Sequence, residues 1–339
     1  MLSNNQLNKQ SFEGKPLWLS QLADAPPVDW IWYGRIPRGH LSILEGPPGI
    51  GKTMLLCDIA SKLSRAQPLP DVPESKHCFR MLRTLFLSAE DDPSTLRARV
   101  MAAQGELTSI GVLEDLMTFP NHAEALRAMV HDYGIDLVVI DPINSFLASN
   151  IDSYRDTDVR RALGPLRDVA RLEGAGVVLI RHLIKSGQGP AMNRGIGSIA
   201  FTGLARVVLQ LVPHGEGYAL AWAKGNLSKA PMALPFTIEG EENPKIIWGE
   251  PMPGTADDLL SVSTSIAGSN SDHVCAGFIE KLVMEKGPML TNAIKDLAEH
   301  QGWTGGTFKR AQQILKGKGI ITFNESGRWM TGFKTPFDS

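Results

Sequence analysis

Short apolar runs alternate with amphipathic stretches between about residue 30 and residue 250 of the chain. The runs 135–140 and 176–180 are apolar at almost every position, which is typical of strands buried on both faces of a sheet. The stretches 122–133 and 157–173 come before these runs and predict amphipathic helices. Strands and helices that alternate in this way predict an α/β domain with a mainly parallel sheet.

Further strands are expected at 41–45, 83–88, 206–211 and 218–223. The last two are separated only by a turn at 214–217. Because strands joined so tightly pair as a hairpin, we expect the parallel sheet to end in an antiparallel edge.

The chain changes character after residue 250. The segment 254–271 is rich in serine and contains Gly268 and Asn270, which predicts a flexible linker. Helices are expected over about 272–286, 291–300 and 304–316, followed by a β-hairpin over 320–330. Three helices and a hairpin in so short a segment predict a winged helix-turn-helix. The chain is thus divided into an N-terminal arm (1–29), an α/β domain (30–250), a linker (251–271) and a winged-helix domain (272–339).

Composition adds only broad limits. Of the 339 residues, 43% are hydrophobic and 21% charged, and the formal net charge of −2 indicates no general attraction to a polyanion. The three cysteines are widely spaced, which fits a reducing compartment and not a disulfide framework or structural zinc site. With neither a signal-peptide pattern nor an apolar stretch of membrane-spanning length, we expect a cytoplasmic protein without a membrane partner.

The segment 46–53 matches the phosphate-loop pattern G-x-x-x-x-G-K-[ST], with a strand before it and a helix after it. Glycines let several backbone N–H groups point into one cavity at a helix N-terminus, where the helix dipole also favours anions. Lys52 is expected to reach the β- and γ-phosphates, and the Thr53 hydroxyl to ligate Mg²⁺. ATP and Mg²⁺ are the expected cofactors, and the expected nucleotide-binding residues are Gly46, Pro47, Pro48, Gly49, Ile50, Gly51, Lys52, Thr53 and Met54.

Two carboxylates follow predicted strands. Asp141 ends the strand 135–140, where it can complete the Mg²⁺ shell; alternatively, Asp141 and the proline after it only end the strand. Glu90 follows the strand 83–88 and can orient or deprotonate the water that attacks the γ-phosphate. The alternative is that Glu90, Asp91 and Asp92 only start the next helix; we assign Asp91 and Asp92 to its cap and Glu90 to catalysis.

His182 follows the strand 176–181 and is placed to sense the γ-phosphate, although a lone histidine is more often only packed or solvated. The glycine-rich segment 186–198 comes next. Together with Lys185, its Arg194 is a candidate contact for nucleic-acid phosphates; a plain surface loop is the alternative.

Four segments carry a family resemblance: 32–39, 86–93, 136–142 and 181–185. In order and spacing they resemble the RecA-fold ATPases of plasmid RepA-type hexameric replicative helicases, over about residues 30–250. The resemblance implies Glu90 as catalytic base, Asp141 on Mg²⁺ and His182 as γ-phosphate sensor. It also implies a ring of subunits, each ATP lying between two of them and contacted by a basic residue of the neighbour.

Two residues resemble that basic contact. Arg206 precedes the strand after the glycine-rich segment, and Lys224 resembles the first member of a Lys-x-Arg pair whose second position here is Asn226. The alternative is that both are solvated strand ends.

The C-terminal segment is locally basic, with six basic residues and one acid over 301–334. On its predicted recognition helix we expect Thr307 and Gln313 to face solvent together with the basic residues. DNA binding fits this charge, while winged helices also bind proteins. The nucleic-acid candidates here are Lys309, Arg310, Lys316 and, on the wing, Arg328.

Together these features predict an ATP-hydrolysing, ring-forming motor on single-stranded DNA, a homo-hexamer or other ring. We expect a replicative helicase of a plasmid, phage or similar element, with replication proteins as further partners. Alternatives are an ATP-gated DNA-binding regulator or partition-type switch, a filament-forming recombination or repair ATPase, and a small-molecule kinase.

Overall fold

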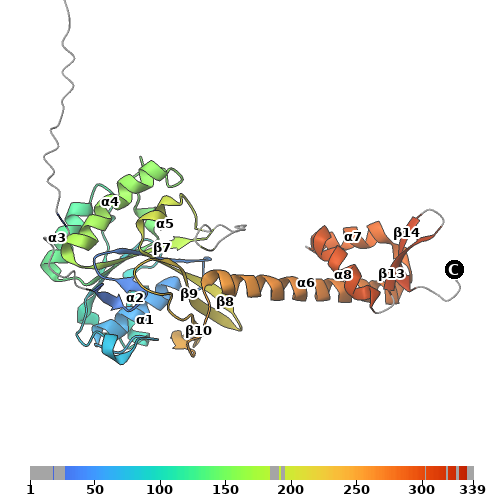
Figure 1. The fold of residues 1–339 in the computed structure, drawn as a ribbon, viewed down its shortest axis with the longest axis horizontal. Coiled ribbons are helices and arrows are strands. Elements are labelled where there is room, and N and C mark those ends of the chain that lie inside the picture. The colour runs from blue at the N-terminus through green and yellow to red at the C-terminus, as the bar shows by residue number, and fades with distance from the viewer. Residues whose placement is uncertain are drawn as a thin grey trace, which may run out of the picture.

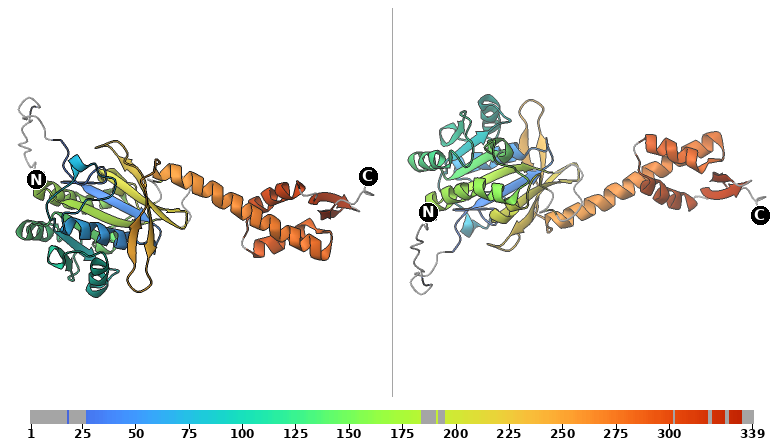
Figure 2. Two further views of the ribbon diagram at one scale, coloured as in Figure 1. Left: turned by 90° about the horizontal axis from the view of Figure 1, so that it is seen from below. Right: turned by 90° about the horizontal axis from the view of Figure 1, so that it is seen from above.

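The computed structural model describes residues 18, 27–183, 191, 195–301, 303–317, 320–325 and 328–333, without the side chains of 262–271, 321, 323–325, 328–329 and 333. Figure 1 shows an α/β domain from which one long helix, α6 (Ala256–Lys286), leads to a small C-terminal module. The two views of Figure 2 show the same separation.

A nine-stranded sheet forms the centre of the α/β domain, in the order β11-β10-β9-β8-β3-β7-β6-β4-β5. The strands from β8 to β5 are parallel, and β9, β10 and β11 add an antiparallel extension. The predicted sheet is therefore confirmed, although β5, β10 and β11 were not expected. Their bounds are β3 (Leu41–Gly46), β4 (Thr84–Ser88), β5 (Ile110–Leu113), β6 (Leu137–Asp141), β7 (Gly176–His182), β8 (Val207–His214), β9 (Gly217–Gly225), β10 (Leu234–Glu239) and β11 (Lys245–Trp248).

Helices cover both faces of this sheet. Apolar side chains of α1 and α2 pack on one face, and those of α3, α4 and α5 on the other. Each strand therefore has to be apolar on both sides, which explains the nearly unbroken apolar runs of β6 and β7. The helices are α1 (Lys52–Ser64), α2 (Pro93–Ala102), α3 (Ala123–Tyr133), α4 (Asp156–Glu173) and α5 (Ala200–Leu204), with short 3₁₀ turns at Glu74–Lys76, Leu107–Ser109 and Ile143–Phe146.

The α6 helix corrects the expectation of a flexible linker over 254–271. The chain is helical from Ala256, and Thr255 and Asp258 form a reciprocal cap at its start. Ala256 and Leu259 also pack against the small apolar cluster on β8 and β9. A cap and tertiary packing thus outweigh the weak helix propensity of the serines and glycine that follow. The division of the chain into four parts stays a prediction.

The C-terminal module contains the three expected helical segments and the hairpin. Its core is formed by side chains of α6, α7, α8 and β13, among them Ile279, Ile294 and Phe308. The sheet order is β12-β14-β13. The bounds are β12 (Met289–Leu290), α7 (Thr291–His300), α8 (Gly305–Lys316), β13 (Ile320–Glu325) and β14 (Arg328–Phe333).

None of the helices that the structure describes combines the length and apolar character needed to cross a membrane.

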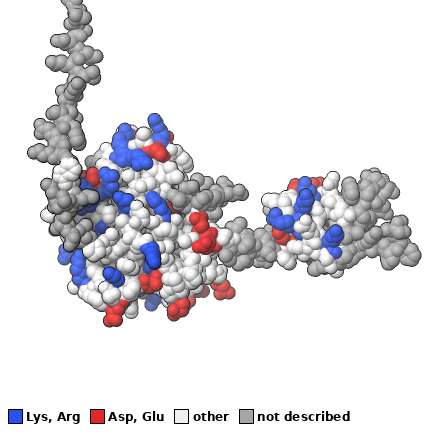
Figure 3. Space-filling model, in the orientation of Figure 1, with Lys and Arg blue, Asp and Glu red and all other residues white. Residues whose placement is uncertain are grey.

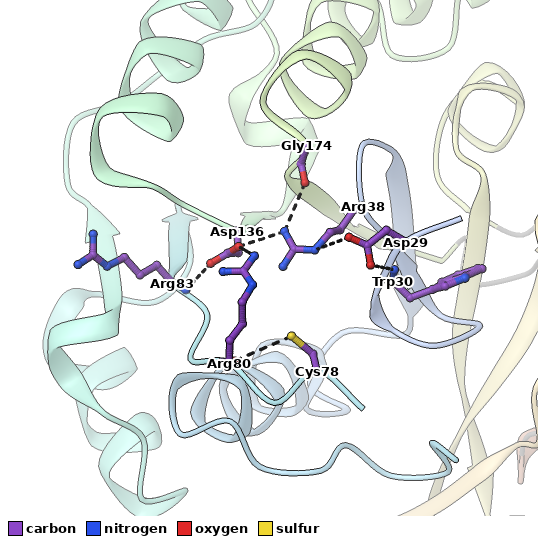
Figure 4. Close-up of polar contacts among 8 residues, drawn as sticks. All are labelled: Asp29, Trp30, Arg38, Cys78, Arg80, Arg83, Asp136 and Gly174. Atoms are coloured by element: carbon purple, nitrogen blue, oxygen red, sulfur yellow. Dashed lines mark hydrogen bonds and ion pairs between the residues drawn. The ribbon is translucent and has the colours of Figure 1, made fainter. Parts of the chain in front are cut away.

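An ionic cluster fixes the amino edge of the sheet (Figure 4). Asp136, just before β6, accepts hydrogen bonds from Arg38 (3.0 Å), Arg80 (2.6 Å) and the backbone N–H of Arg83 (3.0 Å). Arg38 also pairs with Asp29 at 3.3 Å, next to the two-stranded ribbon β1 (Trp30–Trp32) and β2 (Ile36–Pro37). The cluster therefore ties the segment before the sheet to the start of the strand that ends in Asp141.

Replacing Asp136 by alanine should lower the free energy of unfolding by about 3 kcal/mol, because two arginines lose a largely buried partner. Chemical denaturation measures this change. The matched control is Asp168→Ala, since Asp168 is half-exposed and its ion pairs with described residues are long, at 3.6 and 3.8 Å. The control should change stability by less than about 1 kcal/mol; equal losses in both variants would contradict the assignment.

Candidate active site

The phosphate loop lies between the end of β3 and the start of α1. Gly49 (φ 76°) and Gly51 (φ 85°) have left-handed backbone conformations, which explains why glycine is needed at both positions. Among the described residues, no side chain caps the first turn of α1. Its N–H groups are therefore suited to bind an anion. The Ile50 side chain is buried in the core and so anchors the loop.

Parallel strand register brings the other predicted residues to this loop. Gly46 at the end of β3 is paired with His182 at the end of β7, and Ser88 at the end of β4 is paired with Asp141 at the end of β6. Glu90 lies two residues after β4. All these residues lie at the carboxyl edge of one sheet, where open α/β folds bind ligands.

Thr53 and Asp141 meet at the bottom of the site. The Thr53 hydroxyl donates to Asp141 over 2.5 Å, and the Asp141 side chain is buried. Burial raises the pKa of Asp141 to about 6, opposed by the Thr53 hydrogen bond and supported by the charges of Glu90 and Asp91. A hydroxyl and a carboxylate in contact are the hard oxygen donors that Mg²⁺ prefers. The residues present therefore fit a Mg²⁺ ion.

Lys52, His182 and Glu90 form a hydrogen-bonded chain beside this pair. The Lys52 ammonium donates to the carbonyls of Gly46 (3.1 Å) and Pro47 (2.8 Å) and lies 3.2 Å from His182 Nδ1. Because an ammonium can only donate, Nδ1 is the acceptor. His182 Nε2 therefore carries the proton and donates to Glu90 over 3.0 Å. Burial lowers the pKa of Lys52, while the charges of Asp141 and Glu90 raise it.

A cavity of about 300 Å³ opens beside Thr53 and the Lys52–His182–Glu90 chain. It is lined by the expected loop residues Gly49, Gly51, Lys52, Thr53 and Met54, by Glu90 and His182, and also by Asp91, Arg99, Ile238 and Pro244.

The last four lining residues were not expected. Asp91 pairs with Arg99 of α2, so its assignment to the helix cap was wrong. Asp92 alone is the cap: it accepts from the Thr95 N–H at 2.8 Å, and hydrogen bonds lower its pKa. Ile238 and Pro244 come from the β10–β11 hairpin, which no sequence motif marks.

The structure places Arg206 and Lys224 away from this cavity. The Arg206 N–H donates to the carbonyl of Leu41, where β3 begins, so Arg206 lies at the amino edge of the sheet. Lys224 lies beside it and donates to the carbonyls of Thr202 and Ala205. Burial, and then the charge of Arg206, lower the pKa of Lys224. Neither residue is thus positioned to serve the site of its own subunit, and a role in a neighbouring site stays a prediction.

The structure describes only some of the residues predicted to contact nucleic acid. Lys185 and Arg194 lie outside the described residues, as does the side chain of Arg328. Lys309, Arg310 and Lys316 are exposed on α8, and Figure 3 shows basic and acidic side chains on one face of this module. Arg310 also pairs with Asp272 of α6 at 2.7 Å.

One neighbouring position on α8 was wrongly predicted. We expected Thr307 to be exposed, but it is buried. Its N–H bonds the side chain of Thr304, the N-cap of α8, so Thr307 belongs to the helix cap and not to the outer face.

Residues 10–188, more than half of the chain, match the family described as AAA domain. The chain is also similar to the DNA repair protein RadA of Brucella abortus (strain 2308), at 26% identity over 74% of this chain and 56% of that protein. It is 22% identical to the RadA of Campylobacter jejuni over 73% of this chain and 54% of that protein. The chain spans about half the length of these curated relatives.

Asp141→Asn should stabilise the protein at neutral pH, measured by denaturation without nucleotide or Mg²⁺. The pKa of Asp141 in the folded state, about 6, lies above its ordinary 3.8, so the folded state binds the proton more tightly. Its contribution to the unfolding free energy therefore falls as pH rises from about 4 to about 6, by up to about 3 kcal/mol. Asparagine carries no charge. The variant should therefore have a larger free energy of unfolding than the wild type at pH 7 and about the same one near pH 4. A variant that is less stable at pH 7 would contradict this.

Proposed function

The chain belongs to the AAA domain family, and on this basis we propose that it is a Mg²⁺-dependent, RecA-like ATPase that forms a ring and moves along single-stranded DNA. The observation that carries the proposal is one cavity lined by phosphate-loop residues and by the Lys52–His182–Glu90 chain, with buried Asp141 bonded to Thr53 of its lining. The resemblance to RepA-type hexameric helicases supports the ring and the movement on DNA.

The site offers suitable residues for both ATP and Mg²⁺. The N–H groups at the start of α1 and the Lys52 ammonium would hold the phosphates of ATP, and Thr53 and Asp141 would hold Mg²⁺. Bound there, Mg²⁺ would neutralise negative charge on the phosphate oxygens.

Lys52, Glu90 and His182 each have a separate role in the proposed hydrolysis. Lys52 exchanges its carbonyl partners for phosphate oxygens. Glu90 then orients the attacking water and accepts its proton as general base. His182 contacts both Lys52 and Glu90, so its position depends on how those two groups are engaged. His182 thereby reports the state of the γ-phosphate to the segment that follows β7.

Contact with DNA is assigned to two regions. Lys185 comes three residues after His182, and Arg194 lies farther along the segment that follows β7. In the C-terminal module, the order of helices and strands and the exposed Lys309 and Lys316 support a DNA-binding winged helix. Arg310 contributes less, because its charge is already paired with Asp272.

A second candidate function is a repair or recombination ATPase that forms filaments on DNA. It is favoured by the relatives, which are named DNA repair protein RadA. Two measurements separate the candidates: electron micrographs with ATP and single-stranded DNA, and strand displacement on a forked substrate. Closed rings and strand displacement support the first function, whereas open helical filaments without displacement support the second.

Two substitutions test the site itself. Lys52→Ala should abolish ATP turnover and weaken ATP binding, because it removes a charge that contacts the phosphates. Glu90→Gln should bind ATP normally and lower kcat by about 10²–10⁴-fold, the contribution typical of a general base. Circular dichroism checks folding, and Glu124→Gln on the exposed face of α3 is the matched control. Undiminished turnover in either variant would remove its assigned role.

Arg206 should act on the nucleotide of the neighbouring subunit. Arg206→Ala should lower kcat by about 10³-fold or more, as loss of an arginine finger does. Mixing Arg206→Ala subunits with inactive Lys52→Ala subunits should restore turnover, because some interfaces then combine an intact Lys52 with an intact Arg206. A mixture as inactive as its components would exclude action between subunits.

A further inference from the structure

A buried ion pair lies directly behind the catalytic edge of the sheet. Glu45 precedes the first glycine of the phosphate loop, Arg181 precedes His182, and the two residues are paired in register between β3 and β7. Arg181 donates from both Nε (3.0 Å) and Nη2 to Glu45 Oε1. The two side chains are 2% and 0% exposed, so this pair is shielded from solvent. Neither side chain lines the cavity, and the proposed chemistry does not use them.

Arg181 also holds the chain segment that returns to the sheet after β7. Its Nη1 donates to the carbonyl of Ser198 at 3.4 Å, and its guanidinium lies 5.0 Å from the ring centre of Phe201. Gly195 lies so close that a Cβ there would come within 2.0 Å of the guanidinium. The guanidinium thus fills the space between the end of β3 and the segment 195–201.

The same segment is attached to the sensor residue. The Ile196 N–H donates to the carbonyl of His182 at 2.9 Å, and Leu183 pairs with Gly195. Ser198 is fixed in turn by its hydroxyl, which donates to Asp156 at the start of α4. A displacement of the β7 end is therefore passed to residues 195–198 through both backbone and side-chain contacts.

The polar layer around this pair has unused hydrogen-bonding capacity. Gln210 of β8 is paired in register with Glu45 on the other side. Glu45 Oε2 and both polar atoms of the Gln210 amide are buried without a hydrogen-bond partner among the described residues. Burial raises the pKa of Glu45, although Arg181 opposes this. The structure shows Glu45 paired with Arg181, and the remaining oxygen, Oε2, could accept a hydrogen bond from the Gln210 amide in a second arrangement, as a switching element requires.

We propose that Arg181 is a positioning residue that couples the phosphate loop to residues 195–198 through its ion pair with Glu45. The state of the nucleotide then sets the conformation of this segment. One consequence of the proposal, an effect on DNA binding, rests on the proposed function. Residues 195–198 directly follow the segment with Lys185 and Arg194, the candidate DNA contacts. The rival explanation is that the pair only stabilises the fold, as many buried ion pairs do.

Hydrogen–deuterium exchange of the full-length protein separates the two explanations. Peptides spanning 195–201 are compared with and without Mg²⁺ and a non-hydrolysable ATP analogue, whose affinity is measured in parallel. The variants are Arg181→Lys, which keeps the charge but loses the forked geometry, and Glu45→Gln, which keeps the volume. The matched control is Arg35→Lys, because Arg35 is equally buried, bonds Asp71 and the carbonyl of Met232, and lines no part of the cavity.

The wild type and Arg35→Lys should show a change of about fivefold or more in exchange on binding the analogue. In Arg181→Lys and Glu45→Gln this difference should fall below about twofold, while analogue affinity stays within about threefold of the wild type. The proposal is overturned if the Arg181 and Glu45 variants keep the difference, or if the wild type shows none. Binding of single-stranded DNA is measured separately. If the exchange differences are as expected but the wild type does not bind DNA, the proposed DNA partner is wrong and the coupling through Arg181 is still supported.

Discussion

The parallel register of β3, β7 and β6 is the constraint on which the site depends. Because these strands run in the same direction and end at the same level, a loop, a histidine and a carboxylate that are far apart in sequence meet at one edge. The pairing of Gly46 with His182 places Lys52 within reach of the imidazole, and β4 brings Glu90 to its other nitrogen. The backbone hydrogen bonds of the sheet thus bring these residues together.

The two ends of β6 carry carboxylates in different surroundings. At its amino end, Asp136 is compensated by two arginines and a backbone N–H, which makes it an anchor. At its carboxyl end, the buried Asp141 accepts a hydrogen bond from the Thr53 hydroxyl, and its raised pKa shows that burial of its charge costs free energy. A divalent cation would offset this cost. The same strand therefore carries one carboxylate with three donors and one that we propose binds a metal.

Sequence alone predicted the parts of the site that have a local signature. The phosphate loop was predicted from its glycine and lysine pattern, and Asp141, Glu90 and His182 were predicted from their places at the ends of apolar strands. Asp91 and Arg99 could not be paired in this way, because their contact depends on how α2 is oriented. Ile238 and Pro244 come from a hairpin distant in sequence. The first part of α6, before residue 272, was missed because composition suggested a linker, whereas its cap and its packing on β8 and β9 decide the structure.

The most direct test of the account is the binding of a fluorescent ATP analogue to the wild type and to Asp141→Asn, each with and without Mg²⁺. If Asp141 faces the phosphate loop across a shared metal site, Mg²⁺ should strengthen binding to the wild type, and the substitution should remove most of that gain. Binding without Mg²⁺ should be equal or tighter in the variant, since a negative charge near the phosphates is lost. An unchanged Mg²⁺ dependence in Asp141→Asn would contradict the central claim.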